Sequence, residues 1–275
     1  MKKLHSFLSF LLVITFLTLA ENSAGQEIPP VIVLAFGDSI TQGLARKYDG
    51  EGGIIRWGNL EPPMGRPTTN WGYPIELDKI IEAELPIFLD TGEPVSATVH
   101  NWGHMGFTSG DMLDCQDHPK NCIDTVLASN SSAGFILILL GANDIYQNIA
   151  SIDTRFNLGQ IIDKCREANI EPILGTLSPI TDSHAPFPHY KVNDIYNLEI
   201  RDLALEKEVL LADHYVAMEE DWNLYTSGDG LHLSRSGNEK MARTWYETLV
   251  QSEQFKTPPL TQIYFLLLGN SSTAD

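Results

Sequence analysis

The chain has 275 residues, of which 43% are hydrophobic, and its 36 acidic and 18 basic residues give a formal net charge of −18. A surface of this charge repels phosphate backbones, which argues against nucleic acid as a partner. The length and the apolar content are sufficient for one domain with a sizeable core.

The first 25 residues have the pattern of a secretory signal peptide. Lys2 and Lys3 give a positive start, an apolar run follows over residues 7–20, and small residues follow at 23–25. The apolar run is shorter than the roughly 20 residues that cross a bilayer, which argues against a retained anchor. We therefore expect a signal peptide over 1–25, a secreted or otherwise extracytoplasmic protein, and no stable membrane span after cleavage.

The first predicted strand is the apolar stretch 31–36, whose β-branched side chains are typical of a strand buried in a parallel sheet. Gly37 ends this strand, and Asp38-Ser39 is a polar pair of the kind that caps a helix. Ligands of parallel α/β sheets bind beyond the carboxyl ends of the strands. Ser39 is therefore either a helix cap or an exposed nucleophile.

Residues 44–72 are rich in Gly, Pro and aromatic side chains and show no periodicity, so we expect a long loop or an insertion there. This segment carries Trp57 and Trp71. A strand predicted over 95–100 leads into a loop with Gly103 and Gly106, where the backbone must turn tightly or approach a ligand closely.

The remaining predicted elements alternate between strand and helix. We expect further strands over 135–140, 172–177 and 209–213, and helices over 74–84, 153–168, 191–207 and 236–250, with Asp153 and Ser236 as N-caps. This alternation predicts a parallel sheet covered by helices on both faces. We expect the domain to span 26–256 and the tail 257–275 to be an extension of unknown role.

The cysteines fit an oxidising compartment. Cys115 and Cys122 bracket a short polar loop and are candidates for a disulfide, whereas Cys165 is expected as a buried free thiol. Their spacing matches no zinc motif, and we expect neither a metal nor a cofactor. Asn130 and Asn270 each begin a glycosylation sequon.

Four loops, which begin at Gly37, Asn101, Gly141 and Asp229, are expected on one rim of the sheet. They carry the groups that acyl transfer requires. Ser39 can attack a carbonyl if a base activates it, and His232 can take its proton and return it to the leaving group. Asp229, three residues earlier, can fix the tautomer of that imidazole.

An oxyanion formed by this attack needs hydrogen-bond donors that are already in place. The backbone N–H groups of Ser39 and Gly106 and the side-chain amide of Asn143 are candidates. Gly103 competes with Gly106 for this role.

Four short motifs resemble the four blocks of the SGNH (GDSL) hydrolase family. They are Gly37-Asp38-Ser39-Ile40, the glycine-containing stretch 101–108, Gly141-x-Asn143-Asp144 and Asp229-x-x-His232, in the family's order. The Gly-x-Ser-x-Gly elbow of the larger α/β-hydrolases is absent. One residue departs from the family pattern, because Phe107 stands where many members carry Asp.

The resemblance implies an α/β protein with the SGNH hydrolase fold, a flavodoxin-like three-layer α/β/α sandwich with a five-stranded parallel sheet. It also implies Ser39 as the nucleophile, the Asp229/His232 pair, and Gly106 and Asn143 as oxyanion donors. Asp38 and Asp144 are expected as supporting residues.

We therefore expect a serine esterase that forms an acyl-enzyme and acts on a small-molecule or glycan ester. Short-chain or acetyl esters of carbohydrates are the first choice, with Trp57, Trp71 and Trp102 as candidate sugar-stacking residues. One alternative is a lipase or lysophospholipase for longer acyl chains. The other is a non-catalytic carbohydrate-binding protein on the same fold. The oligomeric state is left open.

Overall fold

The computed structural model of the chain describes residues 31–43, 45–48, 54–57, 72–84, 97–180 and 191–253. The predicted signal peptide over 1–25, Trp71, Asn270 and the tail 257–275 lie outside the described residues, and their expected roles stay predictions. No helix in the described part of the chain has both the length and the apolar character that a bilayer span requires.

The centre of the fold is a five-stranded sheet with the order β4-β1-β5-β6-β7, in which all neighbouring strands are parallel. The strands are β1 (Val31–Gly37), β4 (Ala97–Gly103), β5 (Ala133–Leu139), β6 (Glu171–Gly175) and β7 (Leu210–Ala212). The predicted five-stranded parallel sheet is confirmed. Because the strand order reverses between β1 and β5, the loops that follow these two strands flank the position where such folds bind ligands.

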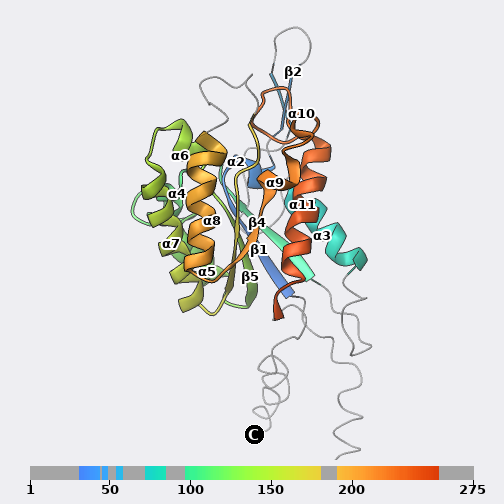
Figure 1. Ribbon diagram of the computed structural model, residues 1–275. Helices are drawn as coiled ribbons and strands as arrows, with labels where there is room; N and C mark the ends of the chain where they lie inside the picture. The colour runs from blue at the N-terminus through green and yellow to red at the C-terminus, as the bar shows by residue number, and fades with distance from the viewer. Residues whose placement is uncertain are drawn as a thin grey trace, which may run out of the picture. The chain divides into compact units, whose positions relative to one another are not determined.

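Helices cover both faces of this sheet (Figure 1). One face carries α3 (Tyr73–Glu84) and α11 (Arg235–Leu249), and the other carries α5 (Ile123–Ser129), α7 (Ser151–Glu167) and α8 (Leu198–Glu206). The shorter helices are α2 (Ser39–Gln42), α4 (Ser109–Leu113), α6 (Ala142–Tyr146), η2 (Lys191–Asn197, π-helical), α9 (His214–Met218) and α10 (Trp222–Tyr225). The three-layer α/β/α architecture is thus confirmed.

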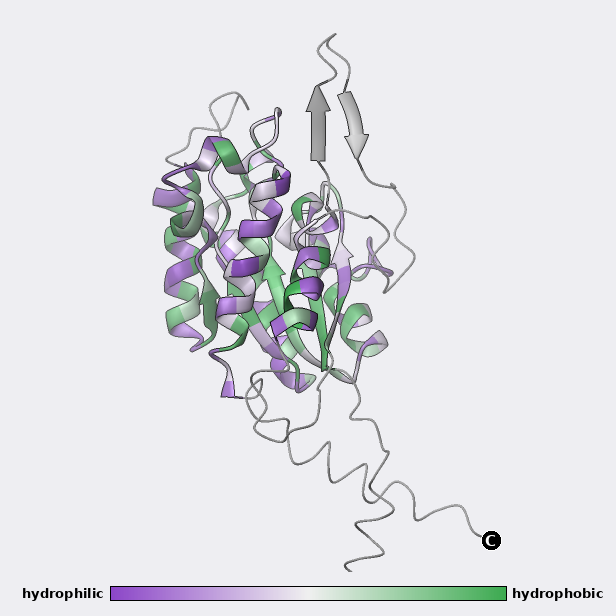
Figure 2. Ribbon diagram, turned by 90° about the vertical axis from the view of Figure 1, so that its right-hand side faces the viewer, coloured by the Kyte–Doolittle hydropathy of each residue, from purple (hydrophilic) through white to green (hydrophobic). Residues whose placement is uncertain are grey.

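The sheet supplies the hydrophobic core (Figure 2). Every residue of β5 is buried, as are the last five residues of β1. Both faces of these strands are covered by helices, so their continuous apolar sequence needs no alternation with polar residues.

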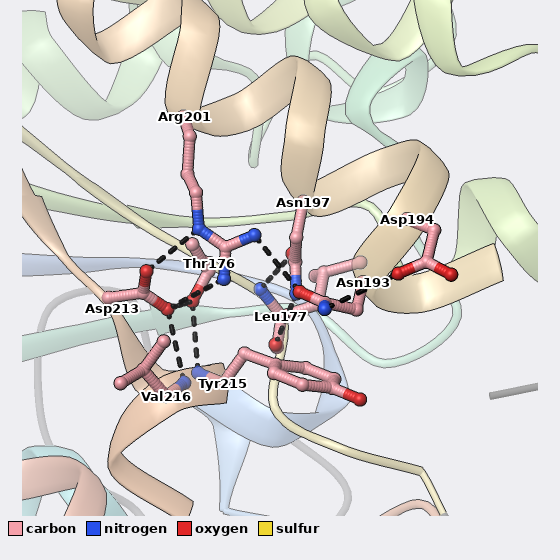
Figure 3. A network of polar contacts seen from close by, with 9 residues as sticks. All are labelled: Thr176, Leu177, Asn193, Asp194, Asn197, Arg201, Asp213, Tyr215 and Val216. Carbon is pink, nitrogen blue, oxygen red and sulfur yellow. Dashed lines mark hydrogen bonds and ion pairs between the residues drawn. The ribbon is translucent and has the colours of Figure 1, made fainter. Parts of the chain in front are cut away.

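A polar network fixes the carboxyl ends of β6 and β7 (Figure 3). The side chain of Asn197, at the end of η2, pairs with both backbone groups of Leu177: Leu177 N–H donates to Asn197 Oδ1 (2.8 Å), and Asn197 Nδ2 donates to Leu177 C=O (2.9 Å). Arg201 of α8 binds Asp213, which also accepts a hydrogen bond from Thr176 Oγ1 (3.0 Å). These contacts attach the helices η2 and α8 to the rim of the sheet.

Several local predictions need correction. Helix α7 is capped by Ala150, and Asp153 lies in its first turn, so Asp153 is not the N-cap. Helix α11 is capped by Ser234, whose Oγ accepts the Gly237 N–H, so Ser236 is not the N-cap. The expected loop over 44–72 contains an antiparallel pair, β2 (Ala45–Tyr48) with β3 (Ile54–Trp57).

The cysteines are arranged as the sequence indicated. Cys115 and Cys122 form a disulfide with a Cα–Cα distance of 5.1 Å. Cys165 is a buried thiol whose pKa burial raises to about 12. The side chain of Asn130 is buried and its Nδ2 donates to Val126 C=O (2.7 Å), so the asparagine of this sequon is not accessible for glycosylation in the folded chain.

Candidate active site

A sharp turn between β1 and α2 places Ser39 at the carboxyl edge of the sheet. A Cβ at Gly37 would lie 2.2 Å from Thr41 Oγ1 and 2.5 Å from Leu139 C=O, so only glycine allows the helix to start this close to the sheet. Asp38 caps α2, and its Oδ1 accepts the Ile40 N–H (2.9 Å). Ser39 is therefore the first residue of a short, tightly held helix.

The structure brings Ser39, His232 and Asp229 into one hydrogen-bonded chain. His232 Nε2 lies 2.9 Å from Ser39 Oγ, and His232 Nδ1 lies 2.7 Å from Asp229 Oδ2. An ionised carboxylate only accepts hydrogen bonds, so Nδ1 carries the proton and Nε2 is left to accept the Ser39 hydroxyl proton. All three residues are buried, with exposed fractions of 7% for Ser39, 5% for Asp229 and 4% for His232.

Local turns hold the Asp229-x-x-His232 segment in shape. Asp229 Oδ1 accepts the backbone N–H groups of Leu231 (3.0 Å) and His232 (2.9 Å) and the hydroxyl of Ser227 (2.8 Å). Gly230 takes a positive φ of 73°, which suits glycine. Helix α11 follows almost at once, so the position of the imidazole is fixed to a long helix with one buried face.

The charge of Asp229 is stabilised within the site. Burial alone would raise the pKa of this carboxyl group, but the hydrogen bond from His232 and the proximity of its ring hold the pKa well below its usual range. Asp229 is therefore ionised at any pH at which an imidazole can act as a base.

The three expected oxyanion donors lie on the loops that follow β1, β4 and β5. The Ser39 N–H belongs to the first turn of α2, where N–H groups have no acceptor within the helix. Among the described residues, no acceptor binds the Gly106 N–H. Asn143, in the first turn of α6, donates one amide hydrogen from Nδ2 to Phe107 C=O (2.8 Å), which leaves the other hydrogen of Nδ2 available.

The geometry distinguishes between Gly103 and Gly106. Gly103 N–H donates to Asn101 Oδ1 (2.8 Å), and a Cβ at Gly103 would lie 2.1 Å from Gln42 N. Gly103 therefore allows β4 to pack against α2, whereas Gly106, with φ 82°, keeps its N–H available. This arrangement favours Gly106 as the donor.

Asn101 and Gln42 have positioning contacts that the sequence did not reveal. Asn101 Nδ2 donates to Thr41 C=O (2.8 Å), and Gln42 Oε1 accepts the Met105 N–H (2.9 Å). The first bond joins β4 to α2, and the second joins the loop after β4 to α2. The polar Asn at the end of an apolar strand was the available signal for the first of these contacts, whereas Gln42 had none.

Asp144 lies behind the Asn143 amide and is fully buried. Its carboxylate accepts the Ser109 N–H (2.9 Å), the Ser109 hydroxyl and the Thr154 hydroxyl (3.0 Å). It thereby joins α6 to α4 and α7, which is the geometry of a supporting residue.

Of the three candidate sugar-stacking tryptophans, the structure describes the side chain of Trp102. Trp102 is 7% exposed and belongs to the hydrophobic core, because β4 extends to Gly103 and includes Trp102 in the strand. This burial argues against Trp102 as a sugar-stacking residue. Trp57 is the last residue of β3, and its side chain is not among those that the structure describes.

Asn143→Ala is expected to reduce kcat by roughly 10²–10³-fold, because an oxyanion donor acts mainly on the transition state. Steady-state kinetics on an ester substrate will measure this loss. Gln147→Ala, an exposed position just after α6, is the control. A loss below about fivefold would remove Asn143 from the oxyanion hole.

Asp38→Asn is expected to make the protein more stable at high pH. Burial raises the pKa of Asp38 from 3.8 to about 7, against the opposing hydrogen bond from the Ile40 N–H. Between pH 3.8 and 7 the folded protein holds a proton that the unfolded chain has released, so stability falls as the pH rises and the cost is complete above pH 7. Asn keeps an acceptor for the Ile40 N–H but carries no charge.

Urea unfolding from pH 4 to pH 8 will measure this effect. The free energy of unfolding of Asp38→Asn should increase relative to the wild type by up to about 4 kcal/mol over that range. If the difference in free energy of unfolding between the two proteins stayed constant with pH, the buried charge of Asp38 would not be its cause.

The sequence from residue 35 to residue 240 matches the model of the GDSL-like Lipase/Acylhydrolase family. No curated protein matched the chain. Among solved structures, the acetylxylan esterase Axe2 from Geobacillus stearothermophilus is 18% identical, with a TM-score of 0.60 over 81% of this chain and 96% of that chain. The lipase/acylhydrolase from Enterococcus faecalis is 21% identical, with a TM-score of 0.57 over 79% and 94%. A putative GDSL-like lipase from Parabacteroides merdae is 17% identical, with a TM-score of 0.58 over 81% and 98%. At these identities the likeness to the three structures establishes the fold.

Proposed function

The chain belongs to the GDSL-like lipase/acylhydrolase family and is therefore a carboxylic ester hydrolase; from this premise we propose that Ser39, His232 and Asp229 are its catalytic triad. The observation that carries the proposal is the continuous hydrogen-bonded chain from Ser39 Oγ through both imidazole nitrogens to Asp229. A non-catalytic carbohydrate binder would have no use for this buried arrangement.

In the proposed mechanism Ser39 Oγ attacks the ester carbonyl carbon while its proton passes to His232 Nε2. Asp229 stabilises the resulting imidazolium. The oxyanion accepts hydrogen bonds from the Ser39 and Gly106 N–H groups and from Asn143 Nδ2. The C–O bond to the alcohol then breaks, and His232 protonates the departing oxygen. Water, activated by the same imidazole, hydrolyses the acyl-enzyme and restores the Ser39 hydroxyl.

We propose short-chain esters, above all acetyl esters of carbohydrates, as the substrates. Support comes from the predicted signal peptide, which would bring the protein to extracellular glycans, and from the fold shared with an acetylxylan esterase. Trp57 and Trp71 remain candidates for sugar stacking.

Longer acyl chains are the second candidate. Met105, Tyr146 and Leu224 are large exposed hydrophobic residues. They lie just after β4, at the end of α6 and in α10, close in sequence to Gly106, Asn143 and Asp229. Apolar side chains beside these residues would suit a lipid acyl group.

Hydrolysis of p-nitrophenyl esters from acetate to palmitate, by the wild type and Ser39→Ala in parallel, tests both proposals. Serine-dependent turnover that is highest on acetate, together with release of acetate from acetylated xylooligosaccharides, is the expected result. A maximum at long chains would keep the nucleophile but replace glycan esters with lipids. Turnover that does not depend on Ser39 would overturn the proposed triad.

A further inference from the structure

The segment His104–Phe107, here called the oxyanion loop, is held firmly at its start. His104 N–H donates to Gly37 C=O (2.8 Å), and Met105 N–H donates to Gln42 Oε1 (2.9 Å). Among the described residues, the Gly106 N–H donates to no acceptor, and a Cβ placed at Gly106 would meet nothing within 4 Å. The position of its N–H group therefore depends on the residues that flank it.

Phe107 provides the support on the other side of Gly106. Its ring stacks on the His104 ring, with centroids 4.0 Å apart and an angle of 8° between the planes. Burial, together with the nearby His118, lowers the pKa of His104, which favours a neutral ring in this stack. The Phe107 carbonyl accepts the hydrogen bond from Asn143 Nδ2 (2.8 Å). Phe107 thus contacts both proposed donors, by a peptide bond to Gly106 and by a hydrogen bond to Asn143.

A third ring holds Phe107 in place. The His118 ring lies 4.4 Å from the Phe107 ring, at 52°. His118 Nε2 is 3.4 Å from Asp111 Oδ1, and the carboxylate of Asp111 also closes the capping box of α4. Among the described residues, His118 is the ring that joins Phe107 to the next loop of the chain.

The loop that carries His118 is closed by the Cys115–Cys122 disulfide. Within it, the His118 carbonyl accepts the N–H groups of Asn121 and Cys122, both at 3.1 Å. Closing a loop of this length removes many of the conformations in which the His118 ring would leave Phe107.

We propose that His118, held by the Cys115–Cys122 disulfide, is a positioning residue for the oxyanion hole that acts through the ring of Phe107. The inference rests on the proposed function, since it gives Gly106 and Asn143 their role as oxyanion donors. It also assigns a role to Phe107, the residue at which this chain departs from the pattern of its family.

The kinetic signature of such a role is specific. The oxyanion forms only on the way to the transition state, so loosening its donors lowers kcat and leaves KM nearly unchanged. We expect about a 5- to 50-fold loss of kcat for His118→Ala, less than for the deletion of a donor, because small displacements of a donor weaken its hydrogen bond without removing it.

The experiment compares variants of the disulfide loop on the best p-nitrophenyl ester, alone and with Asn143→Ala. His118→Ala and the double variant Cys115→Ser/Cys122→Ser should both lose kcat at constant KM. His118→Phe, which keeps a ring against Phe107, should recover most of the loss. Lys120→Ala, an exposed position in the same disulfide loop, should match the wild type. In an Asn143→Ala background, His118→Ala should cost less than it does alone, because one of the donors that it positions is already gone.

Equal activity of His118→Ala and the wild type, a loss confined to KM, or a His118→Phe variant as impaired as His118→Ala would each overturn the inference.

If the double serine variant does not fold, dithiothreitol treatment of the folded wild type replaces it. The two thiols of the reagent are oxidised to a disulfide as Cys115 and Cys122 are reduced to thiols, and kcat should fall by a similar factor; unchanged kcat in the reduced protein would count against the inference. Absence of Ser39-dependent turnover in the wild type would instead refute the proposed function.

Discussion

Ser39→Ala is expected to lower kcat for ester hydrolysis by about 10⁴-fold or more, because it removes the nucleophile on which the acyl-enzyme depends. The substitution deletes one buried oxygen atom whose hydrogen bond is with His232 (2.9 Å) and leaves the glycine turn and the Asp38 cap unchanged. The fold and KM should therefore stay close to those of the wild type. Single-turnover and steady-state kinetics will measure the loss.

His232→Ala should cause a loss of similar size, and the double variant should be little worse than either single one. Groups that act as one catalytic unit give strongly non-additive effects. Losses that multiply in the double variant would mean that Ser39 and His232 act independently, which the proposed mechanism does not allow.

Asp229→Asn is expected to lower kcat by about 10⁴-fold. Asp229 Oδ1 already accepts three hydrogen bonds and Oδ2 accepts the His232 Nδ1–H. An amide can keep the first set only by presenting its NH₂ group to Nδ1, which forces the proton onto Nε2, where the Ser39 proton must go. The imidazole would then be held in the unproductive tautomer.

Ser227→Ala is the matched control for this prediction. It removes one hydrogen bond to Asp229 Oδ1 but keeps the negative charge and the bond to His232. We expect a loss of about tenfold or less for this variant, in line with the net contribution of about 1 kcal/mol that one hydrogen bond typically makes. If Asp229→Asn retained more than about a tenth of the wild-type kcat, the carboxylate would not be orienting the imidazole.

The sequence predicted the parts of the fold that have strong local signals. Strands β1 and β5 are continuous apolar runs, and each is recognisable without knowledge of its neighbours. The short helices α4, α6 and α10 were missed, since four or five residues give too few turns for a periodic pattern. The cap of α7 was misplaced because Ala150 makes no side-chain capping bond and so leaves no signal in the sequence. The cap of α11 was misplaced because Ser234 and Ser236 both stand near its start.

The candidate site likewise contains residues that the sequence predicted and residues that it did not. Ser39 and the Asp229/His232 pair stand in short motifs with recognisable residue types, and the structure places them within hydrogen-bonding distance. The supports were not predictable, because Gln42 and His118 act through contacts with residues that no local pattern connects to them. The burial of Trp102 was not predictable for a related reason, because it depends on how far β4 extends.

Covalent labelling by diisopropyl fluorophosphate tests the central claim most directly. Attack by Ser39 Oγ on phosphorus, with loss of fluoride, should leave one diisopropylphosphoryl group on Ser39, and peptide mass spectrometry should find it in proportion to the loss of esterase activity. His232→Ala should react far more slowly, because the hydroxyl lacks its base. Inactivation with the label on another residue, or full esterase activity in a protein fully labelled at Ser39, would contradict Ser39 as the nucleophile.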